Sequence, residues 1–429
     1  MSMNLIFVIW ICLLLAGMPI YTGLGLASIL HILTSPSLSP FVVSQKVVMA
    51  ANSFPLLAIP FFILMGNIMN TSGVTGRIFN FANALVGWMR GGLGHANVVA
   101  SVIFAGMSGS AVADAGGLGQ IEIAAMRRGG YDDDFTCAVT AASATVGPII
   151  PPSLPMIIYA VLAEASVGGL FLGGMLPGLC MAGGMMLMVR YYAIKRHYPY
   201  SPMPTIGSLW TSFRQAFWAI LTPIILLVGI FWGICTPTES AVIAAFYALF
   251  LGLFVYRELK FRDIPKAILA TNESIGVILA LIMTAALFAW DLSIAQVPQT
   301  IGRYLDDFTL SSPVLLIIGI NIFLLFVGCF METTAAMMIL VPILFPIAEK
   351  VGMSSIQFGV MIVLNLMIGT VTPPIGVVLF VTSNVAKVPF DRVARATLPF
   401  LVPLIFTLLL IAVWPPLTTW LPWAIMGVK

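Results

Sequence analysis

One polar signature occurs twice in this apolar chain, and it constrains the fold more than any other feature. Each copy is a tip that begins with Gly and carries hydroxyl side chains, followed by a second Gly and a Pro-Pro pair. The copies comprise residues 106–110 with 147 and 151–152, and residues 328–334 with 369 and 373–374. The offset is 222 residues, from Gly106 to Gly328, and it also aligns Gly130 with Gly352. A fixed offset of this kind predicts an internal repeat.

The composition places the repeat in a membrane. Hydrophobic residues make up 60% of the chain and charged residues only 8%, against about 25% charged in soluble domains. A crossing needs about 20 apolar residues. The predicted crossings are 4–33, 53–70, 74–89, 168–194, 213–234, 237–256, 272–291 and 396–423. The first run is too long for a signal peptide, so we expect a retained helix bent near Pro19.

Neither signature fits a simple crossing. Residues 92–107 and 110–126 form two short limbs around a polar tip, which predicts a re-entrant hairpin. The stretch 133–163 is interrupted by Gly147 to Pro152, so we expect one broken crossing. The second copy repeats both features. Its limbs are 313–328 and 333–349, and its broken helix is 356–386.

Basic residues test the resulting topology. Five predicted crossings separate the hairpins, so the second hairpin should enter from the opposite face. This topology places Lys46, Arg90, Arg127, Arg128, Arg190, Lys195, Arg196, Arg214, Arg257, Lys260, Arg262, Lys266, Lys387, Arg392 and Arg395 on one side. It places Arg77, Arg303, Lys350 and Lys429 on the other. Because cytoplasmic loops are enriched in Lys and Arg, the first side is predicted to be cytoplasmic and both termini periplasmic.

The predicted fold class is an all-α polytopic membrane protein with two inverted repeats, each holding a re-entrant hairpin and a discontinuous helix. N-terminal scaffold helices should occupy 1–90, and further scaffold helices 197–291, with a cytoplasmic amphipathic arm at 257–270. The first repeat core should cover 91–196, with a hairpin at 91–128, a broken helix at 132–164 and a helix at 168–196. The second should cover 292–429, with a hairpin at 312–350, a broken helix at 355–386 and a C-terminal helix at 395–423.

The breaks predict ion sites. Irregular backbone at membrane depth persists only when it is buried in protein or lines a wet cavity, and freed carbonyls there bind cations. We therefore expect about two Na⁺ ions. The first would lie among Ser108, Gly109, Ser110, Thr145, Val146 and Gly147. The second would lie among Glu332, Thr333, Thr334, Gly369, Thr370, Val371 and Thr372. The alternative is that these small residues only permit close helix packing.

An organic anion would sit between the tips. Ser153, Asn365 and Asn384 are the candidate contacts, although such side chains also satisfy local backbone. Asp114, just beyond the first tip, is either a functional acid or the cap of the second limb.

Other charged residues have structural explanations. Thr236 to Glu239 is typical of a capping box. Asp132, Asp133 and Asp134 should form surface pairs, while Glu122 could pair with Arg127 or Arg128. Asp291 falls at the end of a predicted span and needs no deeper role. Hydrolase, metalloprotease and phosphate-loop motifs are absent from the sequence, which argues against an enzyme. The net charge of +3 is too small and dispersed for nucleic acid.

At these motifs the chain resembles the large membrane (M, DctM-type) subunit of tripartite ATP-independent periplasmic (TRAP) transporters. The resemblance rests on residues 61–66, 104–111, 147–153, 236–239 and 372–376. It implies an ion-transporter elevator fold in the bacterial inner membrane. It also implies sodium-driven import of organic acids, of sialic acid or C4-dicarboxylate type.

The resemblance further implies two partners, a periplasmic substrate-binding protein and a small four-helix membrane subunit. Only Met1 to Met3 precede the first apolar run, so we expect the small subunit to be a separate chain. The remaining hypotheses are a stand-alone sodium/carboxylate symporter and a membrane scaffold without an ion site.

Overall fold

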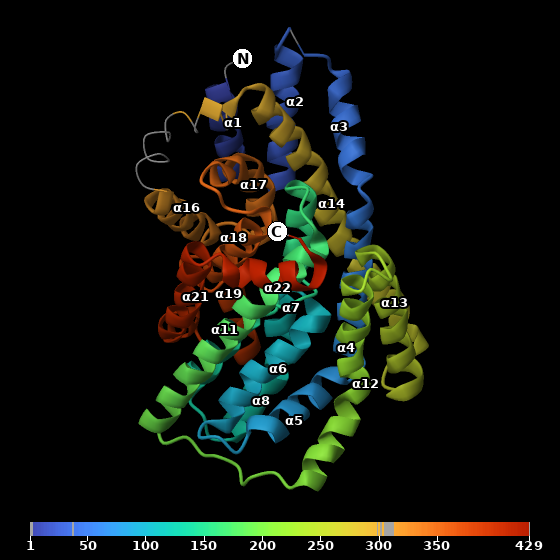
Figure 1. Cartoon of the computed structure of the whole chain (residues 1–429), viewed down its shortest axis with the longest axis vertical. Coiled ribbons are helices and arrows are strands. Elements are labelled where there is room, and N and C mark those ends of the chain that lie inside the picture. Colours follow the sequence, from blue (N-terminus) through green and yellow to red (C-terminus); the bar gives the residue numbers. More distant parts are fainter. Residues whose placement is uncertain (1–2, 37, 298, 301–302, 304–312, 429) are drawn as a thin grey trace.

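All the regular structure described for this chain is helical. The computed structural model describes residues 3–36, 38–297, 299–300, 303 and 313–428, and every element within them is a helix (Figure 1). Residues 304–312, including the first residue of the predicted hairpin 312–350, lie outside the described residues. Seven described helical segments are long and apolar enough to cross a membrane. They are Phe54–Thr71, Val167–Lys195, Ile206–Phe231, Pro237–Val255, Phe261–Ile294, Thr333–Lys350 and Phe390–Val413.

The N-terminal apolar run forms a helical hairpin, so the predicted single crossing at 4–33 is wrong. α1 (Met3–Leu15) packs against α2 (Ile20–Thr34), and a Cβ on Gly23 would lie 3.5 Å from the Trp10 ring. Gly17, with φ of +84°, and Pro19 separate the two helices. Each arm is roughly 20 Å long, too short for hydrocarbon about 30 Å thick.

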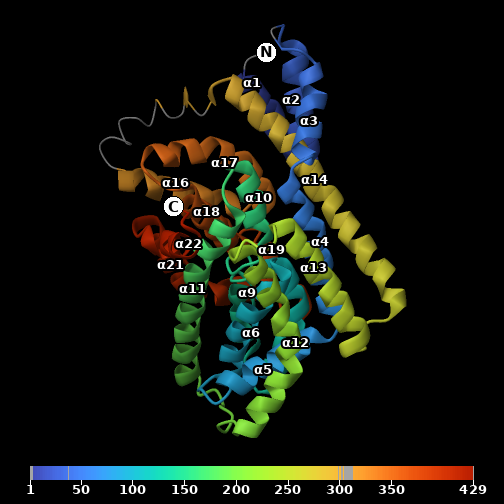
Figure 2. The same ribbon diagram turned by 45° about the vertical axis from the view of Figure 1, so that its right-hand side comes forward.

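One column of helices follows. α3 (Phe41–Ala51), η1 (Phe54–Leu57) and α4 (Ala58–Thr71) succeed one another down one side of the molecule (Figures 1 and 2). α5 (Val74–Val86) then lies across the lower end.

The predicted crossing at 74–89 is also wrong, because both ends of α5 lie on one face. Near its start, Arg77 contacts Glu258 at 2.6 Å, and just after its end the carbonyl of Gly87 accepts a hydrogen bond from the amide of Ser201. The helix buries Val74, Thr75, Ile78, Phe79 and Ala82, which form one apolar stripe. Such a stripe suits a helix lying at an interface.

These two corrections change the predicted membrane face of two basic residues. They do not change the face from which the first hairpin enters. Lys46 lies 5.9 Å from the Trp290 ring, at the opposite end of α14 from Lys266. Arg77 belongs with Glu258 on the lower face. The two residues exchange faces, so the predicted division of fifteen to four is unchanged. One crossing precedes the first hairpin, where three were predicted. Because both numbers are odd, the first hairpin still enters from the predicted face.

The first hairpin and broken helix follow the predicted limbs. The outward limb is α6 (Gly92–Ser108), and the return limb is helical from Ala111 to Arg128. The return limb comprises α7 (Ala111–Ala113), η2 (Asp114–Leu118) and α8 (Gly119–Arg128). The broken helix consists of α9 (Asp133–Ala144) and α10 (Leu154–Leu162). α6 and α8 lie in the lower half of Figure 1.

Long helices connect the two copies of the signature. They are α11 (Val167–Lys195), α12 (Ile206–Phe231), α13 (Pro237–Phe250) and α14 (Ile264–Ile294), with η3 (Leu251–Val255) and η4 (Phe261–Asp263) between the last two. α13 packs on α4, and α14 packs on α2, α3 and α4. Residues 257–270 do not form a separate arm. Asp263 and Pro265 start α14 within that segment.

The second hairpin lies in the upper half of Figure 1, opposite the first. Its limbs are α16 (Pro313–Gly328) and α17 (Thr333–Lys350), and the broken helix consists of α18 (Ser355–Thr370) and α19 (Val377–Ala386). The predicted C-terminal helix 395–423 is interrupted. The segments are α20 (Phe390–Thr397), η5 (Leu398–Phe400), α21 (Leu401–Val413) and α22 (Pro416–Met426). Pro415 disfavours helical backbone at Trp414, and α22 turns onto α11.

The predicted surface pairs and capping box are confirmed. Asp132 pairs with Arg196 at 2.9 Å and Asp133 with Arg127 at 2.6 Å. Asp134 pairs with Arg392 at 2.7 Å. A hydrogen bond from the Tyr198 hydroxyl and the nearby Arg196 guanidinium lower the pKa of Asp132. Thr236 and Glu239 form both bonds of the capping box.

Cysteine labelling tests the corrected N-terminal topology. In a variant without the five native cysteines, Ser39→Cys and Arg128→Cys should react with an impermeant maleimide from opposite faces of the membrane. Both positions are exposed, and a single helical column separates them. Labelling of both from one face in oriented vesicles would show that 4–33 crosses as one helix.

Candidate functional site

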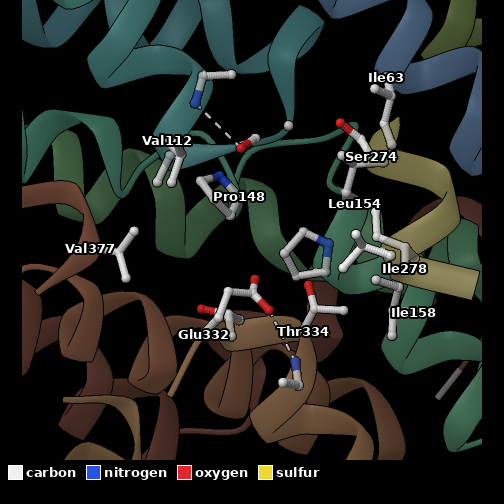
Figure 3. Close-up of a pocket in the computed structure, with 18 of the residues that line it drawn as sticks. Ile63, Val112, Pro148, Leu154, Ile158, Ser274, Ile278, Glu332, Thr334 and Val377 are labelled. Carbon is white, nitrogen blue, oxygen red and sulfur yellow. Dashed lines mark hydrogen bonds between the residues drawn. The ribbon is translucent and has the colours of Figure 1, made fainter. Parts of the chain in front are cut away.

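A cavity of about 650 Å³ lies between the two hairpin tips. This volume is within the usual range of about 300–1,000 Å³ for ligand sites. Figure 3 shows Val112 and Pro148 on one side of the space and Glu332 and Thr334 on the other. α4 and α14 complete the wall with Ile63, Gly66, Asn67, Ser274, Val277, Ile278 and Leu281. Helices α4 and α14 and both copies of the signature therefore contribute to one cavity.

The first tip is shaped by a glycine and a serine. Gly109 has φ of +57°, and a Cβ there would lie 2.8 Å from the carbonyl oxygen of Pro152. The backbone of the tip thus rests directly on the first break. The hydroxyl of Ser110 accepts a hydrogen bond from the Ala113 amide at 3.4 Å and caps the return limb. Ser108, Gly109 and Ser110 all line the cavity.

The first break uses some of the groups that we expected to be free. The carbonyl of Val146 accepts hydrogen bonds from the amides of Ile149 and Ile150, both at 3.0 Å, so it is not unpaired. Thr145 donates its hydroxyl to the Ala142 carbonyl at 2.6 Å.

Ser153 is also occupied within the break. It caps α10 and donates its hydroxyl to the carbonyl of Pro148 at 2.5 Å. The side chain is buried and does not line the cavity. Ser153 therefore supports the break, where we had expected a substrate contact.

Two buried oxygens converge where the first tip meets the first break. The Ser108 hydroxyl and Oδ2 of Asp114 have no partner with hydrogen-bond geometry among the described residues, although the Ser101 hydroxyl is close to Asp114. A Cβ on Gly147 would lie 4.0 Å from Ser108 Oγ and 3.9 Å from Asp114 Oδ2. Asp114 is 1% exposed, and it does not cap the return limb, because Ser110 does. Two unpaired oxygens beside a helix break suit a hard cation.

The second tip meets its own break through two glycines. A Cβ on Gly369 would lie 2.6 Å from the Cα of Gly328, so the two backbones touch. The carbonyl of Gly369 accepts a bond from the Thr372 amide at 3.0 Å. Thr370 and Thr372 donate their hydroxyls to their own helix, at 2.7 Å in each case. Their oxygen lone pairs remain available.

Polar groups of the second tip face the cavity. Glu332 caps α17 by accepting a hydrogen bond from the Ala335 amide at 3.1 Å. The buried Thr333 hydroxyl has no partner with hydrogen-bond geometry among the described residues. Glu332, Thr333, Thr334 and Thr370 all line the cavity, whereas Thr372 does not.

The other two candidate substrate contacts lie elsewhere. Asn365 is buried and donates to Asn321 Oδ1 at 2.7 Å, joining α18 to α16. Asn384 is exposed near the end of α19, close in sequence to Ala386, whose carbonyl accepts from Arg127 on the lower face. Neither residue lines the cavity.

Sequence reasoning missed a polar cluster that joins both limbs of the first hairpin to α9. Asn97 donates to Glu122 and to Thr140, both at 2.8 Å, and accepts from Ser143 at 2.7 Å. Glu122 is fully buried, so the expected pairing with Arg127 or Arg128 is wrong. The sequence feature that could have indicated this cluster is an acid, Glu122, and an amide, Asn97, in the two limbs of the hairpin, both at membrane depth.

Asp291 also has a larger role than expected. It is fully buried, and its Oδ1 lies 2.6 Å from Nδ1 of His31. The pair joins α14 to α2. Within the described residues, no group of three or more His, Cys, Asp or Glu side chains could hold a transition metal.

Four helix starts surround the cavity. Ala111, Leu154, Thr333 and Val377 line it, and they are the first residues of α7, α10, α17 and α19. No Lys or Arg is among the described residues that line it. Helix starts carry partial positive charge and unpaired amides, so this arrangement favours an anion.

The family description "Tripartite ATP-independent periplasmic transporter, DctM component" matches residues 7–417. The chain belongs to this family. It is 43% identical to the sialic acid TRAP transporter large permease protein SiaM of Vibrio cholerae, over 97% of this chain and 98% of SiaM. The relatives of this DctM-family chain are transporter permeases, so it is not an enzyme.

Two other relatives are named for sialic acid and for C4-dicarboxylates. The chain is 43% identical to the sialic acid TRAP transporter permease protein SiaT of Haemophilus influenzae, over 98% of this chain and 68% of SiaT. It is 40% identical to the C4-dicarboxylate TRAP transporter large permease protein DctM of Pseudomonas aeruginosa, over 93% of each chain.

Solved structures share the fold of this DctM-family chain. The YdaH transporter of Alcanivorax borkumensis superposes with a TM-score of 0.64 at 16% identity, covering 88% of this chain and 90% of that one. MtrF of Neisseria gonorrhoeae gives 0.63 at 14% identity, covering 87% and 83%.

Replacing Gly369 with Ala should separate the second tip from its break. The added methyl group would meet the Gly328 backbone, and overpacking of this kind typically costs about 1–3 kcal/mol. We expect the apparent Tm in detergent to fall by several degrees. Gly319→Ala is the control, because no atom lies within 4 Å of its Cβ. Equal Tm values for the two variants would contradict the close contact.

Proposed function

We propose that this chain is the transport subunit of a sodium-driven TRAP importer of small organic acids. The supporting observation is the cavity between the tips, where four helix starts meet and no basic side chain is found among the described lining residues. An anion there would be held by backbone amides and dipoles, as in other transporters with broken helices.

Sodium would supply the missing positive charge. Ser108 and Asp114 offer unpaired oxygens beside the first break. Ser108 lies three residues before the start of the return limb at Ala111, and Asp114 lies three residues after it. Glu332, Thr333 and Thr370 offer oxygens at the second. We therefore infer one ion at each break. An ion beside the carboxylate raises the affinity for it, and by linkage the carboxylate raises the affinity for the ion.

The substrate is proposed from the relatives. SiaM and SiaT are named for sialic acid, and DctM of Pseudomonas aeruginosa for C4-dicarboxylates. Both classes are carboxylates, which agrees with a cavity that favours anions. We propose that the substrate is one of these two classes. We further propose that it arrives on a periplasmic binding protein and that a small four-helix membrane subunit completes the transporter.

Transport is proposed to follow an elevator mechanism with inverted repeats. Each tip rests on its own break, through Gly109 on Pro152 and Gly328 on Gly369. The two repeats also pack on each other, α10 on α17 and α19 on α9, so we infer that both signatures move as one body. α4 and α14 supply the facing wall of the cavity. Along the lower face, α5 links α4 to the first hairpin. The hairpins lie in opposite halves of the molecule, as inverted repeats require.

Reconstitution tests the function directly. We expect proteoliposomes holding this chain and the small subunit, supplied with loaded binding protein, to accumulate labelled sialic acid or a labelled C4-dicarboxylate when sodium is higher outside. Omitting the binding protein should abolish uptake, which a stand-alone symporter would not require. Uptake that ignores an imposed sodium gradient would contradict symport.

Two substitutions test the first ion site. Ser108→Ala and Asp114→Asn each remove one oxygen ligand, and we expect the sodium concentration for half-maximal uptake to rise about tenfold or more. Ser28→Ala is the control, because its buried hydroxyl bonds only to the Leu24 carbonyl within α2. Thr370→Ala tests the second site in the same way. Wild-type sodium dependence in both Ser108→Ala and Thr370→Ala would show that the ions bind elsewhere.

A further inference from the structure

A second cavity, of about 420 Å³, lies at the lower end of the molecule, away from the one between the tips. It forms where the joint between α5 and α6 meets the last turns of α11, a region visible at the bottom of Figure 1. Its polar lining comes from Arg90, His95 and Arg190, with Trp88, Ile194 and Tyr200 around them. The proposed transport function makes no use of these residues.

Two arginines converge on this cavity without a counter-charge. Neither Arg90 nor Arg190 has an ion-pair partner among the described residues, and no acidic side chain is part of the described lining. Other arginines of the same face are compensated. The pairs are Arg77 with Glu258, Arg127 with Asp133, Arg196 with Asp132 and Arg392 with Asp134. Both side chains are exposed, so solvent screens part of their mutual repulsion, and an anion between them would balance both charges.

The cavity also has a buried polar floor. His95 is 1% exposed and lines the cavity. Neither ring nitrogen has a partner with hydrogen-bond geometry among the described residues, although the backbone of Arg90 is close by. Buried polar groups are normally hydrogen-bonded, so the ring nitrogen that does not face the Arg90 backbone is available to a ligand.

Backbone geometry brings these groups together. Gly91, with φ of +78°, precedes the first residue of α6, and a Cβ there would lie 2.6 Å from the Cβ of Ala193 in α11. This contact places Arg90 beside Arg190, one turn from Ala193. The start of the 17-residue helix α6 adds its own partial positive charge at the same place.

The surroundings indicate that the anion comes from the membrane. Trp88 and Tyr200 are 42% and 66% exposed at the rim, and such amphipathic rings favour the boundary between lipid and water. On either side of Arg190, α11 exposes Leu187, Tyr191 and Ile194 in one stripe, which could carry acyl chains. A soluble anion would have no use for this stripe.

We propose that this cavity binds the phosphate of an anionic phospholipid headgroup, held by Arg90, Arg190 and His95. Basic pockets between membrane helices on the cytoplasmic side commonly take such headgroups. The lipid would fix the joint through which α5 meets the first hairpin.

Native mass spectrometry and thermal unfolding of the purified chain test this proposal, with phosphatidylglycerol as the probe and phosphatidylcholine as the zwitterionic reference. We expect phosphatidylglycerol to remain bound to the wild type and to raise its apparent Tm. The double variant Arg90→Gln/Arg190→Gln should bind it about tenfold more weakly or worse. Arg128→Gln/Arg395→Gln is the matched control, since it removes the same charge from exposed residues outside the cavity and should bind as the wild type does.

Single variants keep the test decisive if the double variant is poorly folded. Arg190→Gln should weaken binding, and His95→Phe, which keeps a ring of similar size without nitrogens, should do the same. Equal phosphatidylglycerol binding by the wild type and all three variants would overturn the proposal. So would inorganic phosphate that stabilises the protein as strongly as the lipid does, because the anion would then be soluble.

Discussion

Peptide groups that leave a helix inside a membrane must find partners there, and this requirement shapes the centre of the molecule. Each interrupted helix meets the tip of its own hairpin. Gly109 lies against the Pro152 carbonyl, and Gly328 lies against Gly369. The polar backbone of each tip therefore covers the polar backbone of its break. Side chains larger than glycine would hold the tips away and leave the breaks without cover. The same closeness brings the unpaired hydroxyls of Ser108 and Thr333 and four helix starts to one cavity.

The need to balance the charge of a bound carboxylate connects the fold to the proposed transport function. A carboxylate is costly to bury unless opposite charge is near, and no Lys or Arg is among the described lining residues. Helix starts supply part of that charge, and a cation beside Ser108 and Asp114 would supply the rest. Ion and substrate would each lower the desolvation cost of the other. Coupling between them then follows from shared electrostatics, without a separate switch.

The sequence predicted the repeated elements well and the N-terminal region badly. Gly and Pro set the limits of both hairpins and both breaks, because these residues act through local backbone geometry. Gly17 and Pro19 act locally too, but whether the chain bends or reverses there depends on packing of Trp10 against Gly23. Composition could not separate the interfacial helix α5 from a crossing. At the site, Ser153 and Asn365 were predicted as ligands but have protein partners, which only three-dimensional contacts reveal.

The most direct test is a cryo-EM comparison of the transporter in sodium and in a large organic cation. We expect density in sodium between Ser108 Oγ, Asp114 Oδ2 and the Gly147 backbone, and its loss in the organic cation. A sodium map without density there, or with the ion bound away from both breaks, would contradict the central claim that tip and break together form the ion site.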